Sequence, residues 1–420
     1  MEFQKIKLHR SEKNRAAVTQ ITLDDDYNVP DYRQDIVKVI KERGELRFDE
    51  VKAMEGAAWI KGSLVFKVLY RSDKQEGKIS CLRGEIPFQE RLNMDGLSEY
   101  DAVHATGDME DLTIGVINSR KLNVRAVIVL TASSEKEVDE ELTCELSDGS
   151  SYEQNIVEKE ALKLLVVRRD ICRQKSEAVL PSSKPNIREI LWQSMQLRNV
   201  ESRLVEGKIR LSGEILVSIL YNDEEEGEHL SWYETTVPLD AQAECGVMED
   251  DCIWQVQMVP LTMELEVKPD YDGEERILVM ELALDTHIRI WKEEKIRLLT
   301  DLYSLQKEVK PVFRECPLER LLVKNAAKCR MTEQMELKED KEKVLQICSC
   351  EGKVLLERQE IKPDGVLAEG TVEVNILYIT PDDHMPVGAV QEIYPFSQLV
   401  EIPEMSAQAK VELDASLEQL

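Results

Sequence analysis

One pattern of nine residues occurs three times in this chain and constrains its fold more than any other feature. It reads GSLVFKVLY from Gly62 to Tyr70, GEILVSILY from Gly213 to Tyr221 and GTVEVNILY from Gly370 to Tyr378. In each copy the second, fourth, sixth and eighth residues after the glycine are apolar, and most residues between them are polar or small. A period of two with many β-branched side chains predicts a β-strand with one buried face.

Two further features keep a constant distance from this strand in every copy. A proline followed by an apolar residue lies seventeen residues after each tyrosine, and a branched aliphatic residue lies twenty-six residues before each glycine. Such spacing in three copies indicates a tandem repeat. We expect a structural role for the repeat anchors, which are Ile36, Gly62, Tyr70, Pro87, Ile187, Gly213, Tyr221, Pro238, Val344, Gly370, Tyr378 and Pro395.

The repeat divides the chain of 420 residues into units of ordinary domain size. We expect repeat 1 at residues 1–133, repeat 2 at 156–300 and repeat 3 at 301–420. Residues 134–155 have low hydrophobicity and many charges, which favours an acidic linker or an exposed insertion. The copies also match upstream of the anchor strand, because Cys-Arg occurs fifteen residues before both Ile187 and Val344.

Each unit is predicted to be mainly antiparallel β with one short helix. Pro30 and the aspartates before Ile36 are typical of a helix start, and several short strands at this spacing favour a small sandwich or open barrel. The anchor glycine permits a β-bulge or a close backbone approach, or marks the end of a loop. The anchor tyrosines lie on the apolar face, so we expect them in the core with the hydroxyl satisfied at the strand end.

Repeat 3 is shorter than the other two copies. The last predicted strand ends at Leu130 in repeat 1 and at Leu284 in repeat 2, which is 43 and 46 residues after the anchor proline. Only 25 residues follow Pro395. We therefore expect repeat 3 to be truncated, with its last strand supplied by a natural continuation of the chain.

Composition narrows the class of function. The net charge of −28 disfavours binding to nucleic acid or to anionic lipid, because both depend on Lys and Arg. The longest apolar runs are too short for a transmembrane segment, and the first residues lack the apolar core of a signal peptide. Nine cysteines at irregular spacings show no disulfide framework, which favours a reduced, cytoplasmic setting.

No catalytic motif is present in the sequence. It contains no phosphate-binding loop, no dinucleotide fingerprint, no nucleophile elbow and no HExxH pair, and its five histidines are scattered. Cys348 and Cys350 are close together, but they lack a second pair at zinc-ligand spacing. We expect no enzyme activity, no cofactor and no metal site.

The segments NVPDYRQDI (28–36) and LPSSKPNIREIL, the G-x7-Y strand and the triplication resemble the SPOCS-domain family, a spore-coat-associated domain of endospore-forming bacteria. The chain is most similar to the SipL/SpoVID-like spore coat morphogenesis proteins. That resemblance implies a non-enzymatic scaffold on the mother-cell side of the forespore surface, which recruits the basement-layer coat ATPase of the SpoIVA type during forespore encasement. Two features depart from the family: no LysM-like segment is present, and repeat 3 has EDKEKVLQI in place of the Pro-Asp/Asn-Ile motif.

Two functions from different classes remain open. The first is a coat assembly scaffold whose β modules bind coat proteins or each other, for example through exposed strand edges. The alternative is a glycan-binding, cell-wall-associated β module, which needs aromatic platforms. None of the five tryptophans occupies the same repeat position in all three copies, so the sequence favours the scaffold.

Overall fold

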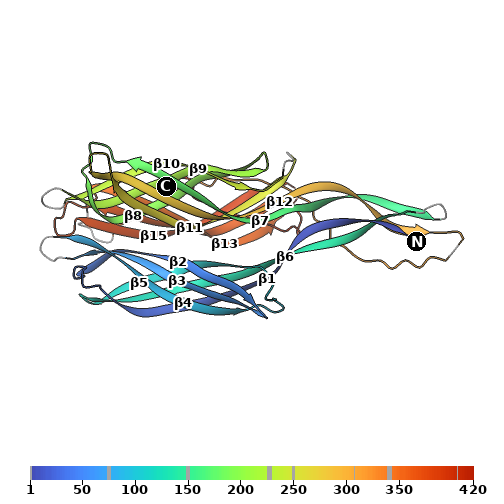
Figure 1. The fold of residues 1–420 in the computed structure, drawn as a ribbon, viewed down its shortest axis with the longest axis horizontal. Coiled ribbons are helices and arrows are strands. Elements are labelled where there is room, and N and C mark those ends of the chain that lie inside the picture. The colour runs from blue at the N-terminus through green and yellow to red at the C-terminus, as the bar shows by residue number, and fades with distance from the viewer. Residues whose placement is uncertain are drawn as a thin grey trace.

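Fifteen β-strands make up the regular structure of the described residues in the computed structural model (Figure 1). The structure describes residues 2–72, 77–147, 152–224, 229–247, 251–306, 308–337, 343–403 and 405–420. The strands form five sheets of three strands each, and all pairings are antiparallel. The described part of the chain contains no helix, and so none that could cross a membrane. The predicted antiparallel β architecture is confirmed.

Repeat 1 is a sandwich of two sheets, ordered β2-β3-β4 and β1-β6-β5. Its strands are β1 (Phe3–Asn28), β2 (Lys38–Met54), β3 (Ala57–Arg71), β4 (Ile79–Asn93), β5 (Val103–Asn118) and β6 (Lys121–Leu146). The anchor strand β3 and the strand β6 are central in their sheets and face each other across one apolar core. The inward side chains of β6 are Leu122, Val124, Ala126, Ile128, Leu130 and Ala132, all fully buried.

Repeat 2 has the same design, with sheets ordered β8-β9-β10 and β7-β12-β11 around a second core. Its strands are β7 (Glu153–Val179), β8 (Ile187–Val205), β9 (Lys208–Asp223), β10 (Leu230–Glu244), β11 (Ile253–Pro269) and β12 (Glu275–Tyr303). Repeats 1 and 2 therefore each begin with a strand that pairs only with the last strand of the same repeat.

Repeat 3 forms a single sheet, β13-β14-β15. Its strands are β13 (Gln346–Lys362), β14 (Gly365–Ile379) and β15 (Val387–Glu401). The described residues 308–337 and 405–420 form no strand. Residues 338–342, which carry the start of the divergent EDKEKVLQI motif, lie outside the described residues.

The short helix expected to start before Ile36, with Ile36, Val37, Val39 and Ile40 along one side, is wrong. Val39 and Ile40 belong to β2. The segment before β2 is a turn followed by extended chain, and its backbone bonds to the β5–β6 hairpin turn. The N–H of Val29 donates to the carbonyl of Arg120 at 2.9 Å, and that of Ile36 to the carbonyl of Ser119 at 2.8 Å. Because the N–H groups bond outward, they are not available for the i to i−4 bonds of a helix.

Most of the expected linker 134–155 is strand instead. β6 continues to Leu146 and β7 begins at Glu153, while residues 148–151 lie outside the described residues. Acidic side chains of β6 pair diagonally across the ladder with basic ones of β1, as in the Lys5–Glu141 and Arg10–Glu140 ion pairs at 3.0 Å. Charge pairs across a ladder stabilise strands that bury little apolar surface. The many charges of residues 134–155 therefore predicted a linker although most of the segment is strand.

The distal ends of β1, β6, β7 and β12 extend beyond the sandwiches and form an arm, visible at the right of Figure 1 together with the N-terminus. The two strand pairs of the arm meet in a small apolar cluster of their own, formed by Leu8, Leu142, Ala161 and Ile296. The arm thus joins repeats 1 and 2 through side-chain packing.

Candidate functional site at the junction of the three repeats

The anchor tyrosines lie at equivalent positions near the end of the central strand. Tyr70, Tyr221 and Tyr378 are each at most 2% exposed. The hydroxyls of Tyr70 and Tyr221 donate to the carbonyls of Gln34 and Pro185, both at 3.1 Å. Burial raises the pKa of Tyr221 to about 12, so its hydroxyl stays protonated. For these two tyrosines the structure has the packing and the hydroxyl partner that the sequence predicts.

The anchor glycines Gly62, Gly213 and Gly370 lie inside the central strand rather than before it, each beside a β-bulge of the preceding strand. The carbonyl oxygens of Arg47, Arg198 and Leu355 lie 2.4, 2.9 and 2.1 Å from the position of a Cβ at these three glycines. A side chain would collide with this backbone. The bulge and the close approach are the two structural alternatives that the sequence left open, and both are present.

The proline anchors have the same setting in all three repeats, whereas the aliphatic anchor differs in repeat 3. Each anchor proline lies with its side chain exposed on an edge strand, where a missing N–H breaks no ladder bond; these are Pro87, Pro238 and Pro395. Ile36 and Ile187 are buried, whereas Val344 is 44% exposed and precedes β13. The anchor position of repeat 3 therefore lacks its core contact.

Sequence reasoning missed two equivalent arginines that hold the chain before β2 and β8. Arg120 donates to the carbonyls of Val29, Pro30 and Arg33 at 3.1, 2.8 and 2.7 Å. Arg276 donates to those of Leu180, Pro181 and Lys184 at 3.4, 2.6 and 3.0 Å. Each arginine belongs to the last hairpin of its repeat, so it ties the second sheet to the turn that enters the first.

The three anchor sheets meet in an apolar junction that the chain builds from equivalent positions of each repeat. The leucine before each anchor tyrosine points out of its own sandwich or sheet into this junction, fully buried, as Leu69, Leu220 and Leu377. Two further equivalent sets complete it: Ile40, Leu191 and Cys348, and Ile79, Leu230 and Val387. The repeats therefore pack around a pseudo-threefold axis.

A buried polar cluster lies beside these side chains and takes members from all three repeats. Glu351 of β13 pairs with Lys41 and Arg43 of β2, both at 3.1 Å, and accepts a hydrogen bond from the indole N–H of Trp192 in β8 at 3.2 Å. The Lys41 ammonium also lies 5.2 Å from the centre of the Trp192 ring. Ser218 and Ser349 are hydrogen-bonded at 2.9 Å, which adds a second polar link between repeats 2 and 3.

Electrostatics keep Glu351 ionised in this cluster. Burial alone would raise its pKa, but Lys41 and Arg43 outweigh burial, so the pKa of Glu351 lies below its usual value. Burial lowers the pKa of Lys41, and Glu351 opposes that shift. A buried carboxylate with two cations and an indole donor is satisfied within the protein. These contacts of Glu351 join the three repeats and leave no free position on the carboxylate for proton transfer.

Two histidines that the sequence left scattered come together between repeats 1 and 2. The rings of His104 and His287 lie 5.5 Å apart, and Arg169 lies 3.1 Å from Nδ1 of His104. Burial, and after it the neighbouring arginines, lowers the pKa of both imidazoles. No group of three or more metal-ligating side chains occurs among the described residues.

The cysteines are thiols in the structure, and none forms a disulfide. Cys348 belongs to the apolar junction, where burial raises its pKa to about 12. Cys350 is half-buried, and burial also raises its pKa. A thiol that resists deprotonation is a poor nucleophile and a poor metal ligand, so neither residue has the character of a reactive site.

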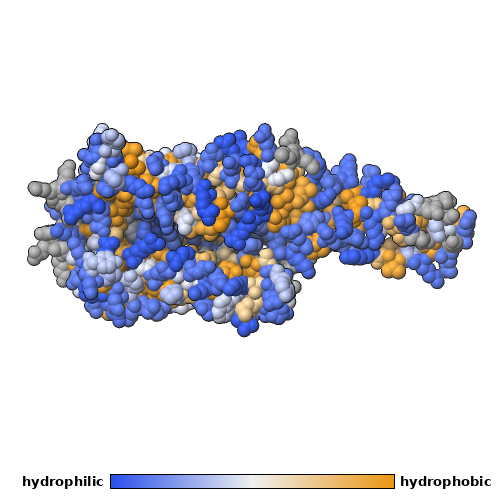
Figure 2. Space-filling model, in the orientation of Figure 1, coloured by the Kyte–Doolittle hydropathy of each residue, from blue (hydrophilic) through white to orange (hydrophobic). Residues whose placement is uncertain are grey.

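Three of the five tryptophans offer no open ring face on the surface. Trp192 is buried in the junction, while Lys184 and Lys324 cover the rings of Trp232 and Trp254 at 4.3 and 4.4 Å. The face shown in Figure 2 is mostly hydrophilic, with apolar side chains in small groups. This surface suits contacts with polypeptides better than stacking of sugar rings.

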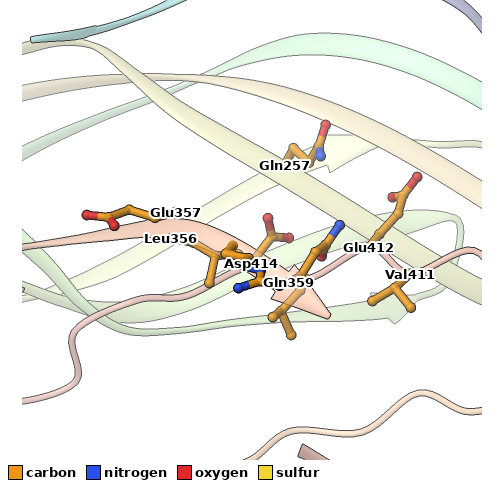
Figure 3. A pocket seen from close by; sticks show the side chains of 9 residues that line it. Gln257, Leu356, Glu357, Gln359, Val411, Glu412 and Asp414 are labelled. Carbon is orange, nitrogen blue, oxygen red and sulfur yellow. The ribbon is translucent and has the colours of Figure 1, made fainter. Parts of the chain in front are cut away.

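A hollow of about 350 Å³ lies beside the end of β13, between that strand and the C-terminal segment (Figure 3). Its lining is mostly polar and includes Gln257, Glu357, Arg358, Glu412 and Asp414. Glu412 also pairs with Arg289 of β12 at 3.4 Å, so the C-terminal segment is attached to repeat 2 here. At this hollow the C-terminal segment does not pack closely against β13.

Comparison with known proteins gives one result. Neither the curated proteins nor the solved structures contain a match to this chain. The family model described as "SipL, SPOCS domain" matches three times, at residues 35–117, 186–268 and 343–420, which is more than half of the chain. Each match begins one residue before an aliphatic anchor, so the matches share the frame of the repeat identified from spacing. The chain belongs to the SipL SPOCS-domain family and carries three copies of its domain.

Proposed function

We propose that this protein is a non-enzymatic scaffold for spore coat assembly that recruits the basement-layer coat ATPase of the SpoIVA type to the forespore surface, on the cytoplasmic, mother-cell side. Family membership supports a role in coat morphogenesis. The observation that carries the scaffold is the junction, because it holds three copies of one domain in a fixed arrangement. A fixed arrangement of similar surfaces lets one chain present several contacts at once.

The chemistry of the junction supports a binding role over a catalytic one. Its ionisable groups are paired with each other and buried, as for Lys41 and Glu351. The paired histidines His104 and His287 are partly buried between two repeats, and their pKa values are lowered. A general acid or base needs access to substrate, which the buried Lys41–Glu351 pair lacks.

The test is direct binding between purified residues 1–420 and a purified coat ATPase of this type. We expect a complex in co-sedimentation and in interferometry, and no nucleotide turnover by the chain alone. A salt series belongs to the experiment, since attraction due only to the acidic charge would vanish at high ionic strength. The control is an unrelated folded β-sandwich of low net charge.

Turnover of nucleotide or cleavage of peptidoglycan by the purified chain would contradict the proposal. So would a fluorescent fusion that stays dispersed in the mother cell while the coat ATPase encircles the forespore. Binding that persists at high salt, together with a ring around the forespore, is the expected pair of results.

A further inference from the structure

A polar cluster between repeats 1 and 2 surrounds the two neighbouring histidines, and we call it the histidine cluster. Repeat 1 contributes His104 of β5 and Glu135 of β6, and repeat 2 contributes Arg169 of β7 and Asp285, His287 and Arg289 of β12. β5 begins opposite Ser134 of β6, and in the described part of the chain β6 beyond this residue pairs only with β1 in the arm. The cluster therefore lies at the base of the arm, where β6 and β12 meet.

The hydrogen bond from Arg169 requires a neutral ring at His104. Nη1 of Arg169 lies 3.1 Å from Nδ1 of His104, and a guanidinium can only donate, so Nδ1 is an acceptor without a proton. Asp285 holds Arg169 in this position, because it accepts two hydrogen bonds from Nε at 2.7 and 2.9 Å. A proton added to Nδ1 would break the bond from Arg169 and place a second positive charge against the guanidinium.

His287 has a carboxylate nearby but no hydrogen bond to it. Its Nε2 lies 3.6 Å from Oε2 of Glu135, which is beyond the usual range of a hydrogen bond. Glu135 also accepts a hydrogen bond from the hydroxyl of Ser11 and lies 3.9 Å from Arg289, whose side chain is only 5% exposed. Arg289 in turn pairs with Glu412 at 3.4 Å. The carboxylate of Glu135 is therefore shared with a permanent cation before any proton reaches His287.

Burial and charge act in the same direction on both rings. Burial, and after it Arg169, lowers the pKa of His104, although Asp285 and Glu135 oppose the shift. Burial, and after it Arg289, lowers the pKa of His287, and a charge on His104 would lower it further, while Glu135 opposes. Because the ring centres are 5.5 Å apart, protonation of one ring disfavours protonation of the other. The folded cluster therefore binds protons less readily than the unfolded chain.

We propose that the histidine cluster is a pH-sensitive contact between repeats 1 and 2: with both rings neutral it holds β5 and β6 against β7 and β12, and proton uptake by the rings loosens this contact at the base of the arm. The same two repeats also meet in the junction and in the small cluster of the arm, which are formed by apolar side chains. We therefore expect the loosening to be local. The inference goes beyond the proposed function, because it holds whatever the chain binds.

The pH range follows from the chemistry of histidine. Since the pKa of each ring is lowered by folding, the contact is fully formed above the ordinary histidine pKa of about 6.5 and weakens as pH falls below it. Carboxylates of ordinary pKa stay ionised until about pH 4 to 5. The pKa of Glu351 is lowered, so the response of the junction comes at more acidic pH and can be separated from that of the histidine cluster.

The first measurement is an NMR titration of the imidazoles in residues 1–420 carrying ¹³C-labelled histidine, with single substitutions to assign the five signals. We expect His104 and His287 each to titrate with a pKa below about 6.5. In His104→Asn, the side-chain oxygen can still accept from Arg169, but no charge can form, so the pKa of His287 should rise. Either histidine titrating at or above the ordinary value would overturn the inference.

The second measurement is hydrogen exchange at about pH 7.5 and about pH 5.5, with rates normalised to the intrinsic rate at each pH. We expect protection of residues 103–106 and 167–171 to fall by at least about threefold at the lower pH, while that of β3 and β9 changes by less than about twofold. The double variant His104→Asn, His287→Gln keeps polar groups at both positions and should show equal protection at the two pH values. His9→Asn in the arm is the control and should keep the full response.

Three results of the exchange experiment would overturn the inference: equal protection at both pH values in the unsubstituted protein, the same loss in the double variant, or a loss that extends equally to β3 and β9. Should the double variant unfold, the titration and the comparison with His9→Asn still decide the question. No coat ATPase takes part in either measurement, so failure here leaves the proposed function standing, and failure of ATPase binding leaves the pH-sensitive contact standing.

Discussion

Single residues set the geometry by which each sandwich closes. Arg120 and Arg276 each satisfy three carbonyls of a turn that would otherwise be poorly bonded. The sequence predicted that the anchor tyrosines are buried, but it did not predict the role of these arginines. Anchors of repeats 1 and 2 lie 151 residues apart, whereas the two arginines lie 156 apart, because the last hairpin turn differs in length. A residue outside the constant frame carries no repeat signal.

At this scale we expect Arg276→Ala to lower the free energy of unfolding by about 3 kcal/mol, because several carbonyls lose a charged donor at once. The Arg276 side chain is only 11% exposed, so water replaces the guanidinium poorly. Chemical denaturation measures the change. Arg210→Ala is the matched control: its ion pair with Asp240 is on the surface and should give no measurable change. Equal stability of the two variants would contradict a structural role for Arg276.

The anchor strands β3, β9 and β14 contribute one face to a core and the other face to the junction. Only the core face was apparent from the sequence. The period-two pattern predicted the core face of β3, β9 and β14, together with the β3–β4 hairpin. The other face looked polar, and its one constant apolar residue, the leucine before the tyrosine, carries the junction. The predicted helix and linker failed for a shared reason: local composition does not show which distant strand will bond to a segment, and here the β5–β6 turn and the arm decided it.

The anchor strand gives a second prediction. Gly62→Ala should destabilise repeat 1 by about 1–3 kcal/mol, since the new Cβ would lie 2.4 Å from the carbonyl oxygen of Arg47 and the bulge would have to shift. Gly115→Ala in β5 is the control, because nothing lies within 4 Å of its Cβ position. Thermal unfolding of both variants measures the difference. Equal stability of the two variants would contradict the close approach at Gly62, since the reduced entropy of the unfolded chain acts alike in both and favours folding.

The three repeats are held together by a junction whose apolar residues are equivalent and whose polar residues are not. Its apolar positions are equivalent in the three repeats, but two neighbouring positions differ. One carries Lys41, Trp192 and Ser349, and the other carries Arg43, Ser194 and Glu351. These differences let one carboxylate meet two cations and an indole. No spacing in the sequence could show this, because the partners are up to 310 residues apart.

The junction predicts that the repeats do not unfold independently near neutral pH. Glu351 is buried with Lys41, and removing one partner of such a pair leaves the other charge without compensation. We therefore expect Glu351→Gln to lower the free energy of unfolding by about 3 kcal/mol at pH 7. The loss should appear in the transitions of all three repeats, which hydrogen exchange can follow separately.

The same residue fixes the sign of the pH dependence. The pKa of Glu351 is lowered in the folded protein, so the unfolded chain binds the proton more tightly. Its contribution is fully present above the usual glutamate pKa of about 4.3 and is lost as pH falls through the folded value. The stability difference between the protein and Glu351→Gln should therefore shrink on acidification below about pH 4. Denaturant titrations from pH 7 to pH 3 measure it, with Glu264→Gln at an exposed position of β11 as the control. A difference that stays constant over this range would mean that the charge of Glu351 does not hold the repeats together.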